Sequence, residues 1–120
     1  MSGLDLRAVA FDVLAVLVFV GVGRMQHDGG DAFAVGGVLR TLWPFLGGLL
    51  IAVVVVSVGS ARYAAVVTGV AVVVLTAGCG LALRYASGQG IAVSFAIVTV
   101  VVLAVLMLGW RSLAAVVRPG

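Results

Sequence analysis

The most informative polar residue of this sequence is Asp12, which lies inside a long apolar segment near the N-terminus. A charged side chain in the middle of a membrane helix costs about 2.5–3.5 kcal/mol, so it needs compensation from a partner, water or a proton. In one interpretation Asp12 is a coupling carboxylate, which takes up and releases a proton or a cation in apolar surroundings. In the other it forms a structural ion pair with Arg62 or Arg111, and we favour this second interpretation.

A second polar group, formed by Arg24, His27 and Asp28, closes the same segment. On a continued helix their spacing places them on one face, and a histidine beside an aspartate could respond to pH. With Asp31 they would offer a metal one imidazole and two carboxylates, which is a weak ligand set. A single histidine at a loop edge is also a poor axial ligand for haem. We therefore expect a solvated helix end, with no metal and no cofactor.

The chain lacks the sequence patterns of common enzyme sites, such as a phosphate-binding loop, a dinucleotide fingerprint or zinc-ligand spacing. Ser94 and Thr99 are expected to hydrogen-bond the backbone of their own helix rather than to react. All seven basic residues are arginines spread singly along the chain, so no basic patch for nucleic acid is expected. The sequence therefore predicts neither an enzyme nor a nucleic-acid-binding protein.

The elements that carry these residues are predicted to be membrane-spanning α-helices. Of the residues, 64% are hydrophobic and only 9% are charged, whereas a soluble domain has roughly 25% charged residues. The charge-free stretches between Arg40, Arg62 and Arg84 are each long enough for a helix to cross the roughly 30 Å hydrocarbon core of a bilayer. Valine runs inside stretches of this length indicate helices rather than strands. We predict an all-α, compact four-helix bundle, a single transmembrane domain over residues 1–120, with spans near 8–23, 44–60, 63–83 and 91–110.

Several residues near the predicted span ends suit the membrane–water interface. Pro44 fits the first turn of the second span, where its missing N–H is not needed. Trp43 and Trp110 fit the aromatic belt at the interface. The preceding segment, 32–42, is expected either to lie on the interface as a short helix or to extend the second span.

The even number of spans places both termini on one side of the membrane. Arginines predicted on that side are Arg7, Arg62, Arg111 and Arg118, and those on the other side are Arg24, Arg40 and Arg84. This small excess favours cytoplasmic termini by the positive-inside rule. Since the composition is typical of a GC-rich prokaryotic genome, we expect a multi-pass protein of the prokaryotic plasma (inner) membrane, with dual insertion left open.

Small residues at four-residue spacing mark expected helix contacts in the third span, because they let two backbones approach closely in lipid. They form two groups, Ala61, Ala65 and Gly69 at its start and Gly78, Ala82 and Ala86 at its end. The third span is therefore expected at the centre of the bundle or at a homodimer interface, and both alternatives stay open.

Four segments together resemble an uncharacterised prokaryotic membrane-protein family, known as domain of unknown function 3054. They are Asp12 in the first span, Gly23-Arg24-x-x-His27-Asp28 after it, Trp43-Pro44-Phe45, and the pair Val93-Ser94-Phe95 and Leu108-Gly109-Trp110-Arg111 around the last span. The resemblance covers nearly the whole chain. It implies a similar fold and no particular activity. It also favours a set of functional candidates, which are Asp12, Arg24, His27, Trp43, Pro44, Trp110 and Arg111.

Two functions from different classes follow from these features. One is a non-catalytic membrane subunit or scaffold, which binds the lipid bilayer and another membrane protein or a second copy through its small-residue faces. The other is a small homodimeric carrier or ion pathway with Asp12 as the coupling carboxylate. A carrier needs several polar groups converging at mid-membrane, and the spans offer few, so we favour the subunit or scaffold.

Overall fold

A computed structural model of the chain describes residues 6–25, 35–59, 62–89 and 93–117. They form four α-helices: α1 (Leu6–Met25), α2 (Val35–Val58), α3 (Val66–Ala86) and α4 (Val93–Val117). Each helix is long and apolar enough to cross a membrane, and none of these described residues forms a strand. The predicted all-α bundle of four transmembrane helices is confirmed.

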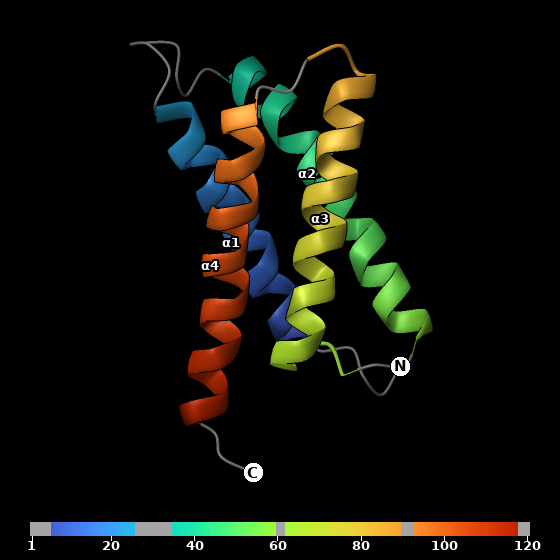
Figure 1. Cartoon of the computed structure of the whole chain (residues 1–120), viewed down its shortest axis with the longest axis vertical. Coiled ribbons are helices and arrows are strands. Elements are labelled where there is room, and N and C mark those ends of the chain that lie inside the picture. Colours follow the sequence, from blue (N-terminus) through green and yellow to red (C-terminus); the bar gives the residue numbers. More distant parts are fainter. Residues whose placement is uncertain (1–5, 26–34, 60–61, 90–92, 118–120) are drawn as a thin grey trace.

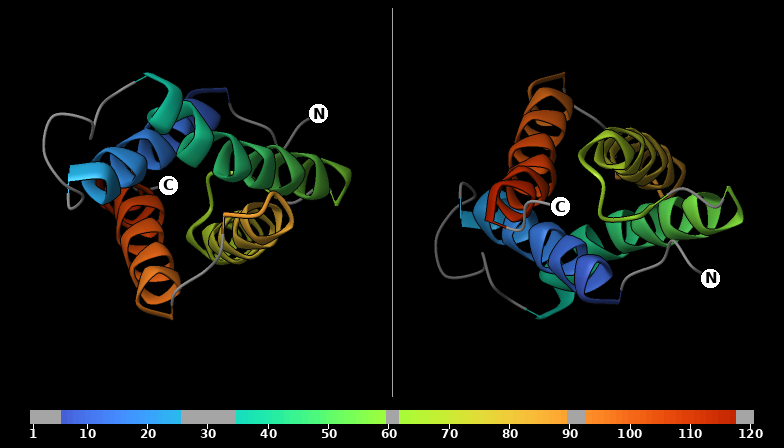
Figure 2. Two further views of the ribbon diagram at one scale, coloured as in Figure 1. Left: turned by 90° about the horizontal axis from the view of Figure 1, so that it is seen from above. Right: turned by 90° about the horizontal axis from the view of Figure 1, so that it is seen from below.

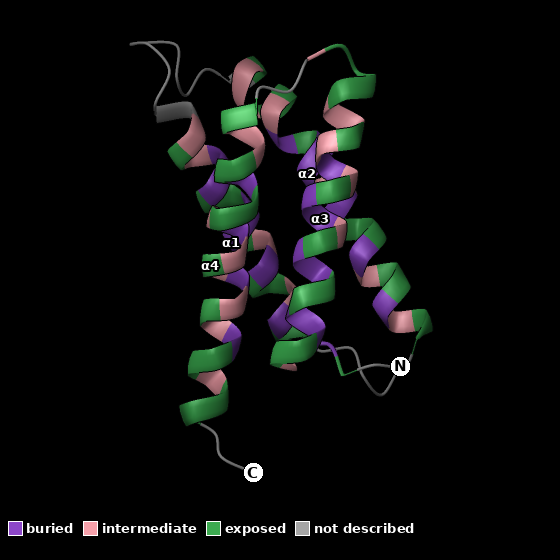
Figure 3. Ribbon diagram, viewed as in Figure 1, coloured by how far each residue is buried: buried purple, intermediate pink, exposed green. Residues whose placement is uncertain are grey.

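The valine-rich segments are helical because a bilayer offers no water to backbone N–H and C=O groups, so each span must satisfy them internally. Many large apolar side chains face outward: Leu50, for example, is 64% exposed and Val67 is 81% exposed. Exposed positions recur along all four helices in Figure 3. Such a surface is suited to lipid rather than to water.

The four helices pack as neighbours in chain order, and α4 returns to contact α1 (Figures 1 and 2). The closest contact joins α2 and α3. Here the backbones approach so closely that a Cβ added to Gly48 of α2 would lie 2.6 Å from the carbonyl oxygen of Thr76 in α3. The start of α1, the end of α2, the start of α3 and the end of α4 lie at the same end of the bundle (Figure 1).

The second span begins earlier than predicted, because α2 starts at Val35 and not near residue 44. Of the two alternatives for the preceding segment, its described residues extend the second span. Pro44 consequently lies inside the helix, fully buried, rather than in its first turn. Proline has no N–H to donate to the carbonyl four residues earlier, which is that of Arg40. That carbonyl instead accepts a hydrogen bond of 2.9 Å from the side-chain amide of Gln89, beyond the end of α3. A side chain thus replaces the missing bond of the helix.

The third span also begins later than predicted, at Val66 rather than near residue 63. Residues 62–65 form a turn in which Tyr63 is fully buried. The carbonyl oxygen of Tyr63 accepts hydrogen bonds from the Arg111 side chain at 3.2 and 3.3 Å. This carbonyl therefore accepts hydrogen bonds from a distant side chain instead of one from a backbone N–H in a further turn of helix.

The small residues of α3 divide into a buried and an exposed set. Gly69 is buried against α4, whereas Gly78, Ala82 and Ala86 are exposed, and no described atom lies within 4 Å of a Cβ added to Gly78. Close packing on α2 instead uses Gly80, where an added Cβ would collide with the ring of Phe45. The predicted contact group at the end of the third span is therefore not used within the described chain, and Ala61 lies outside the described residues.

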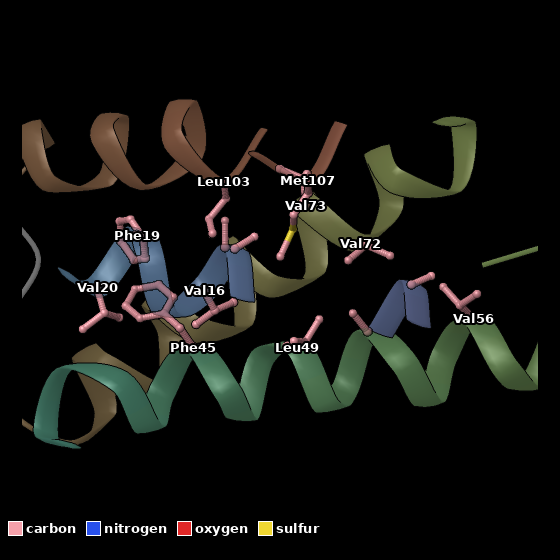
Figure 4. Close-up of a cluster of buried hydrophobic side chains, with 14 of the residues drawn as sticks. Val16, Phe19, Val20, Phe45, Leu49, Val56, Val72, Val73, Leu103 and Met107 are labelled. Atoms are coloured by element: carbon pink, nitrogen blue, oxygen red, sulfur yellow. The ribbon is translucent and has the colours of Figure 1, made fainter. Parts of the chain in front are cut away.

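Buried side chains from all four helices meet in the middle of the bundle (Figure 4). Three phenylalanines pack together here: the rings of the buried Phe19 and Phe45 lie 5.0 Å apart edge to face, and the partly buried Phe95 lies 6.1 Å from each. The apolar side chains of Leu103 and Met107 continue the core along α4 (Figure 4), and the carbonyl of Met107 accepts a hydrogen bond from Arg111. The core lies between two polar regions, one near each end of the bundle.

Candidate functional site

The clearest polar site is a buried network around Asp12, at the end of the bundle that holds the start of α1. Asp12 comes from α1, Arg111 from α4 and Tyr63 from the turn before α3. All three side chains are almost completely buried, with exposed fractions of 0%, 1% and 0%. Three segments distant in sequence are therefore held together by polar contacts inside an apolar bundle.

The centre of the network is a two-pronged ion pair between Asp12 and Arg111. The Nη1 atom of Arg111 lies 2.8 Å from Oδ1 of Asp12, and Nη2 lies 2.7 Å from Oδ2. A planar guanidinium and a carboxylate match in this geometry, so both hydrogen bonds are short and charge-assisted. Of the two arginines considered from the sequence, Arg111 is the partner, and Arg62 is exposed.

Two further donors complete the surroundings of the Asp12 carboxylate. The hydroxyl of Tyr63 donates to Oδ2 at 2.6 Å, and the indole N–H of Trp110 donates to Oδ1 at 2.9 Å. Each carboxylate oxygen thus accepts two hydrogen bonds. Since the two oxygens of a carboxylate offer about four acceptor positions, the acceptor capacity of Asp12 is filled.

The donors of Arg111 are matched just as completely. Besides the two bonds to Asp12, Nη1 donates to the carbonyl of Met107 at 3.2 Å, while Nη2 and Nε donate to the carbonyl of Tyr63 at 3.2 and 3.3 Å. All five N–H groups of the guanidinium therefore have an acceptor. The energetic cost of burying an ion pair falls when every remaining proton and lone pair is satisfied.

Aromatic rings and a glycine shape the space around the guanidinium. Its Cζ atom lies 4.6 Å from the ring centre of Trp110 and 5.1 Å from that of Tyr63, within the range of cation–π attraction. Trp110 in turn stacks on Phe11 of α1 at 5.1 Å. A Cβ at Gly69 would lie 2.7 Å from Cδ of Arg111, so only glycine at that position leaves room for the arginine stem.

Tyr63 lies between α2 and α3, outside the spans, and remains a neutral hydrogen-bond donor at ordinary pH. Burial, and then the hydrogen bond and charge of Asp12, raise the pKa of its phenol well above the usual value near 10. The positive charge of Arg111 lowers the pKa by a smaller amount. The network consequently keeps one negative and one positive charge, with the phenol proton directed at the carboxylate.

The other residues singled out from the sequence do not join this network. Trp43 is 46% exposed, as an interface residue would be, and Pro44 is buried in α2. Arg24 lies in the last turn of α1, and its side chain is outside what the structure describes, as are His27 and Asp28. Among the described residues, no group of three His, Cys, Asp or Glu side chains could hold a metal ion.

Sequence reasoning missed the hydrogen bonds of Tyr63 and Trp110: it gave Tyr63 no role and treated Trp110 only as an aromatic residue at the interface. Each adjoins an arginine on the membrane side predicted for Asp12, namely Arg62 and Arg111. Tyrosine and tryptophan carry an apolar ring with one polar group, and that group usually finds a partner when buried. This proximity was the available signal, although it did not specify which oxygen each donor would reach.

Asp12 of α1 and Arg111 of α4 both lie inside the region of the chain that matches a known family. The family model described as protein of unknown function (DUF3054) matches residues 9–114, nearly the whole chain, including Asp12 and Arg111. The comparisons found no matching curated protein and no matching solved structure. On the extent of the family match, the chain belongs to the DUF3054 family.

Proposed function

We propose that this protein is a non-catalytic membrane subunit or scaffold in which the Asp12 network holds the helices in place. The observation that carries this proposal is the complete use of the Asp12 carboxylate by four donors from Arg111, Tyr63 and Trp110. A coupling carboxylate must bind and release its ion in turn, so it needs an accessible position. A carboxylate fully occupied by the protein is suited to structure instead.

The surroundings of the network also favour a structural role. A proton added to Asp12 would remove an acceptor from Arg111 and leave a buried guanidinium without its counter-charge, which is costly in a low-dielectric interior. Toward the other end of the bundle lie the apolar core and the rings of Phe19, Phe45 and Phe95. These side chains supply no polar relay by which a proton would reach or leave the carboxylate.

The exposed small residues of α3 support binding to another membrane protein or to a second copy. Gly78, Ala82 and Ala86 leave a smooth surface on which a foreign helix can pack closely. A leucine at Gly78 fits without displacing any described atom near its Cβ. A tagged Gly78→Leu variant should therefore fold normally but lose a partner that the wild type retains in cross-linked native membranes, and equal retention would count against this surface.

Asp12→Asn separates the proposed function from that of a carrier. Asparagine keeps the shape but removes the charge, so Arg111 loses its counter-ion and the free energy of unfolding should fall by about 3–5 kcal/mol. Ser112→Ala, an exposed change beside Arg111, is the control for stability. In sealed vesicles with a pH gradient, the wild type should carry no more protons than empty vesicles.

The opposite pair of results would favour the carrier. It consists of a wild type with proton-driven flux and an Asp12→Asn variant that keeps its stability but loses this flux. In that case Asp12 is a coupling site, and the alternative function replaces the scaffold.

For localisation, we propose the prokaryotic plasma membrane with both termini in the cytoplasm. The small excess of arginine on the side of the termini supports this orientation. Reporter domains fused after Gly120 and inserted at Gly30 should lie in opposite compartments. Mixed signals at both positions would replace a single orientation by dual insertion.

A further inference from the structure

The first turns of α2 are less firmly packed than the turns that follow. Residues 36–41 are each half-buried or exposed, whereas Leu42, Pro44 and Phe45 are buried. Within this range Val38 packs on the core, and it is only partly buried. Segments with few buried apolar contacts open at a low cost in free energy. The start of α2 is therefore the part of this helix that moves most easily.

Pro44 separates this start from the packed part of α2. It lies inside the helix and has no N–H for the carbonyl of Arg40, so one helical hydrogen bond is absent at the junction. One turn earlier, the hydroxyl of Thr41 donates to the carbonyl of Gly37 at 3.0 Å, a contact that often bends a helix. Sharp bends in helices occur at prolines and where a side chain enters the hydrogen-bond ladder. The helix is thus easiest to bend where its packing changes.

Gln89, beyond the end of α3, holds the start of α2 in its observed position. Its side-chain nitrogen donates to the Arg40 carbonyl at 2.9 Å, and its side-chain oxygen accepts a hydrogen bond from Arg84 at 3.3 Å. The backbone of Gln89 is fixed as well: its N–H donates to the carbonyl of Arg84 at 3.1 Å, and Gly88 before it has a φ of 85°. A glycine in this conformation commonly ends a helix. An ordered helix end therefore supplies the bond that Pro44 cannot make.

The start of α2 also forms one wall of a cavity of about 300 Å³. Gly37, Arg40 and Thr41 line the cavity from α2, and Val20 lines it from α1. In Figure 1 this is the upper end of the bundle, where α1 and α3 finish and α2 and α4 begin. Val20 is only 2% exposed, so this part of the lining is shielded in the observed arrangement. A movement of residues 36–41 would change access to it.

We propose that residues 36–41 form a lid over this cavity, with Pro44 as its hinge and Gln89 as its latch. In the closed position, Gln89 bonds the carbonyl of Arg40. In the open position this bond is broken, the carbonyl is hydrated, and the cavity is accessible. One net hydrogen bond changes an equilibrium roughly three- to tenfold, so the latch favours the closed lid without locking it. This device goes beyond the scaffold function, which requires no movement of α2.

Pairs of spin labels on the full chain in lipid nanodiscs test the movement. The labelled pairs are exposed apolar positions in a Cys79→Ala background, namely Leu39 with Ile97 across the lid and Leu50 with Val105 below the hinge. Gln89→Met keeps a side chain of similar length but removes the donor to Arg40. By double electron–electron resonance, this variant should raise the ratio of open to closed lid about three- to tenfold. The distances of the pair below the hinge should not change.

Pro44→Ala distinguishes a latch from a residue that only ends α3. Alanine supplies the N–H that the Arg40 carbonyl lacks, so α2 continues without a break and the bond from Gln89 is no longer needed. Pro44→Ala alone should lower the open fraction of the lid, and adding Gln89→Met should then leave the lid distances unchanged. An equal effect of Gln89→Met in both backgrounds, or no effect in either, would overturn the proposal. So would an equal change at both label pairs, since it would indicate a general loss of packing.

The reaction of a buried cysteine with N-ethylmaleimide tests whether the lid covers the cavity. Val16 and Val20 are both buried in α1, and of these two residues Val20 alone lines the cavity. In the Cys79→Ala chain, Gln89→Met should speed the modification of Val20→Cys about three- to tenfold, in proportion to the open fraction. The modification of Val16→Cys should keep its rate. No increase at Val20→Cys, or an equal increase at both positions, would overturn the lid.

Discussion

At the scale of single residues, a buried ion pair is tolerated here because every donor and acceptor is used. Asp12 accepts four hydrogen bonds and the Arg111 guanidinium makes contacts through all five of its N–H groups. In lipid a polar group without a protein partner has no water to hydrogen-bond, so each unpaired donor or acceptor would lower the stability of the fold. Tyr63 and Trp110 are therefore as much part of the site as the ion pair itself.

The contribution of Tyr63 can be measured with Tyr63→Phe. Losing the hydroxyl that donates to Asp12 should lower the free energy of unfolding by about 1–2 kcal/mol, the size of a hydrogen bond to a charged group moderated by the membrane setting. Tyr85→Phe is the matched control, since Tyr85 is 71% exposed. Chemical unfolding in mixed micelles measures the unfolding free energy of both variants. An equal effect of the two changes would show that the Tyr63 hydroxyl does not stabilise the network.

The same tyrosine predicts how stability depends on pH. Its pKa is raised in the folded state, so the unfolded chain loses this phenol proton first, at a pH near 10. The stability that the Tyr63 phenol contributes to the folded state is fully present below that pH and is lost as the pH rises above it. The wild type should therefore lose stability above pH 10 more steeply than Tyr63→Phe, and parallel curves would show that the phenol is not buried against the carboxylate.

The sequence allowed part of this site to be predicted. An aspartate within a span requires compensation, and topology placed Arg62 and Arg111 on its side of the membrane. The choice between them depended on where α3 begins, since residues 62–65 form a turn and leave Arg62 exposed. Gly69 makes room for the stem of Arg111, and this role depends on how α3 and α4 pack. The spacing of small residues predicts only a close helix contact, and it does not show that the group packed on Gly69 is an arginine side chain.

At the scale of elements, α2 and α3 are joined by close contacts at glycine and by a side chain that replaces a helix bond. Gly48 approaches Thr76, Gly80 receives the ring of Phe45, and Gln89 occupies the carbonyl that Pro44 leaves free. The number of spans could be predicted from hydropathy. The start of α2 stayed open between two alternatives, because Pro44 suits the first turn of a helix as well as an interior position where Gln89 bonds the carbonyl of Arg40.

Two neighbouring glycines of α3 should respond very differently to the same change. Gly80→Ala places a methyl group against the Phe45 ring and should cost about 1–3 kcal/mol of stability through overpacking. Gly78→Ala meets no described atom within 4 Å and should be neutral or stabilising by up to about 1 kcal/mol, since alanine favours helix more than glycine does. Thermal unfolding of both variants compares them, and equal destabilisation would contradict the assigned packing face of α3.

At the scale of the whole molecule, the bundle has two polar regions of different kinds separated by an apolar core. The region at Asp12 is neutral, closed and saturated with hydrogen bonds, whereas the region at Arg40 and Arg84 contains a cavity. The first joins three segments that are distant in the sequence, and the second is lined by residues of all four helices. Composition and hydropathy predicted the bundle, but this difference between its two ends emerges only when the helix ends are placed in space.

The central claim is that Asp12 and Arg111 act as one structural unit, and a double-mutant cycle of unfolding free energies tests it most directly. Asp12→Asn and Arg111→Gln should each cost about 3–5 kcal/mol, since each leaves a buried partner unmatched. The double variant leaves no charge unpaired, so it should cost less than the two single changes together by about 1–3 kcal/mol. If the costs of the two single changes simply add, Asp12 and Arg111 are energetically independent, and the ion pair does not hold the bundle together.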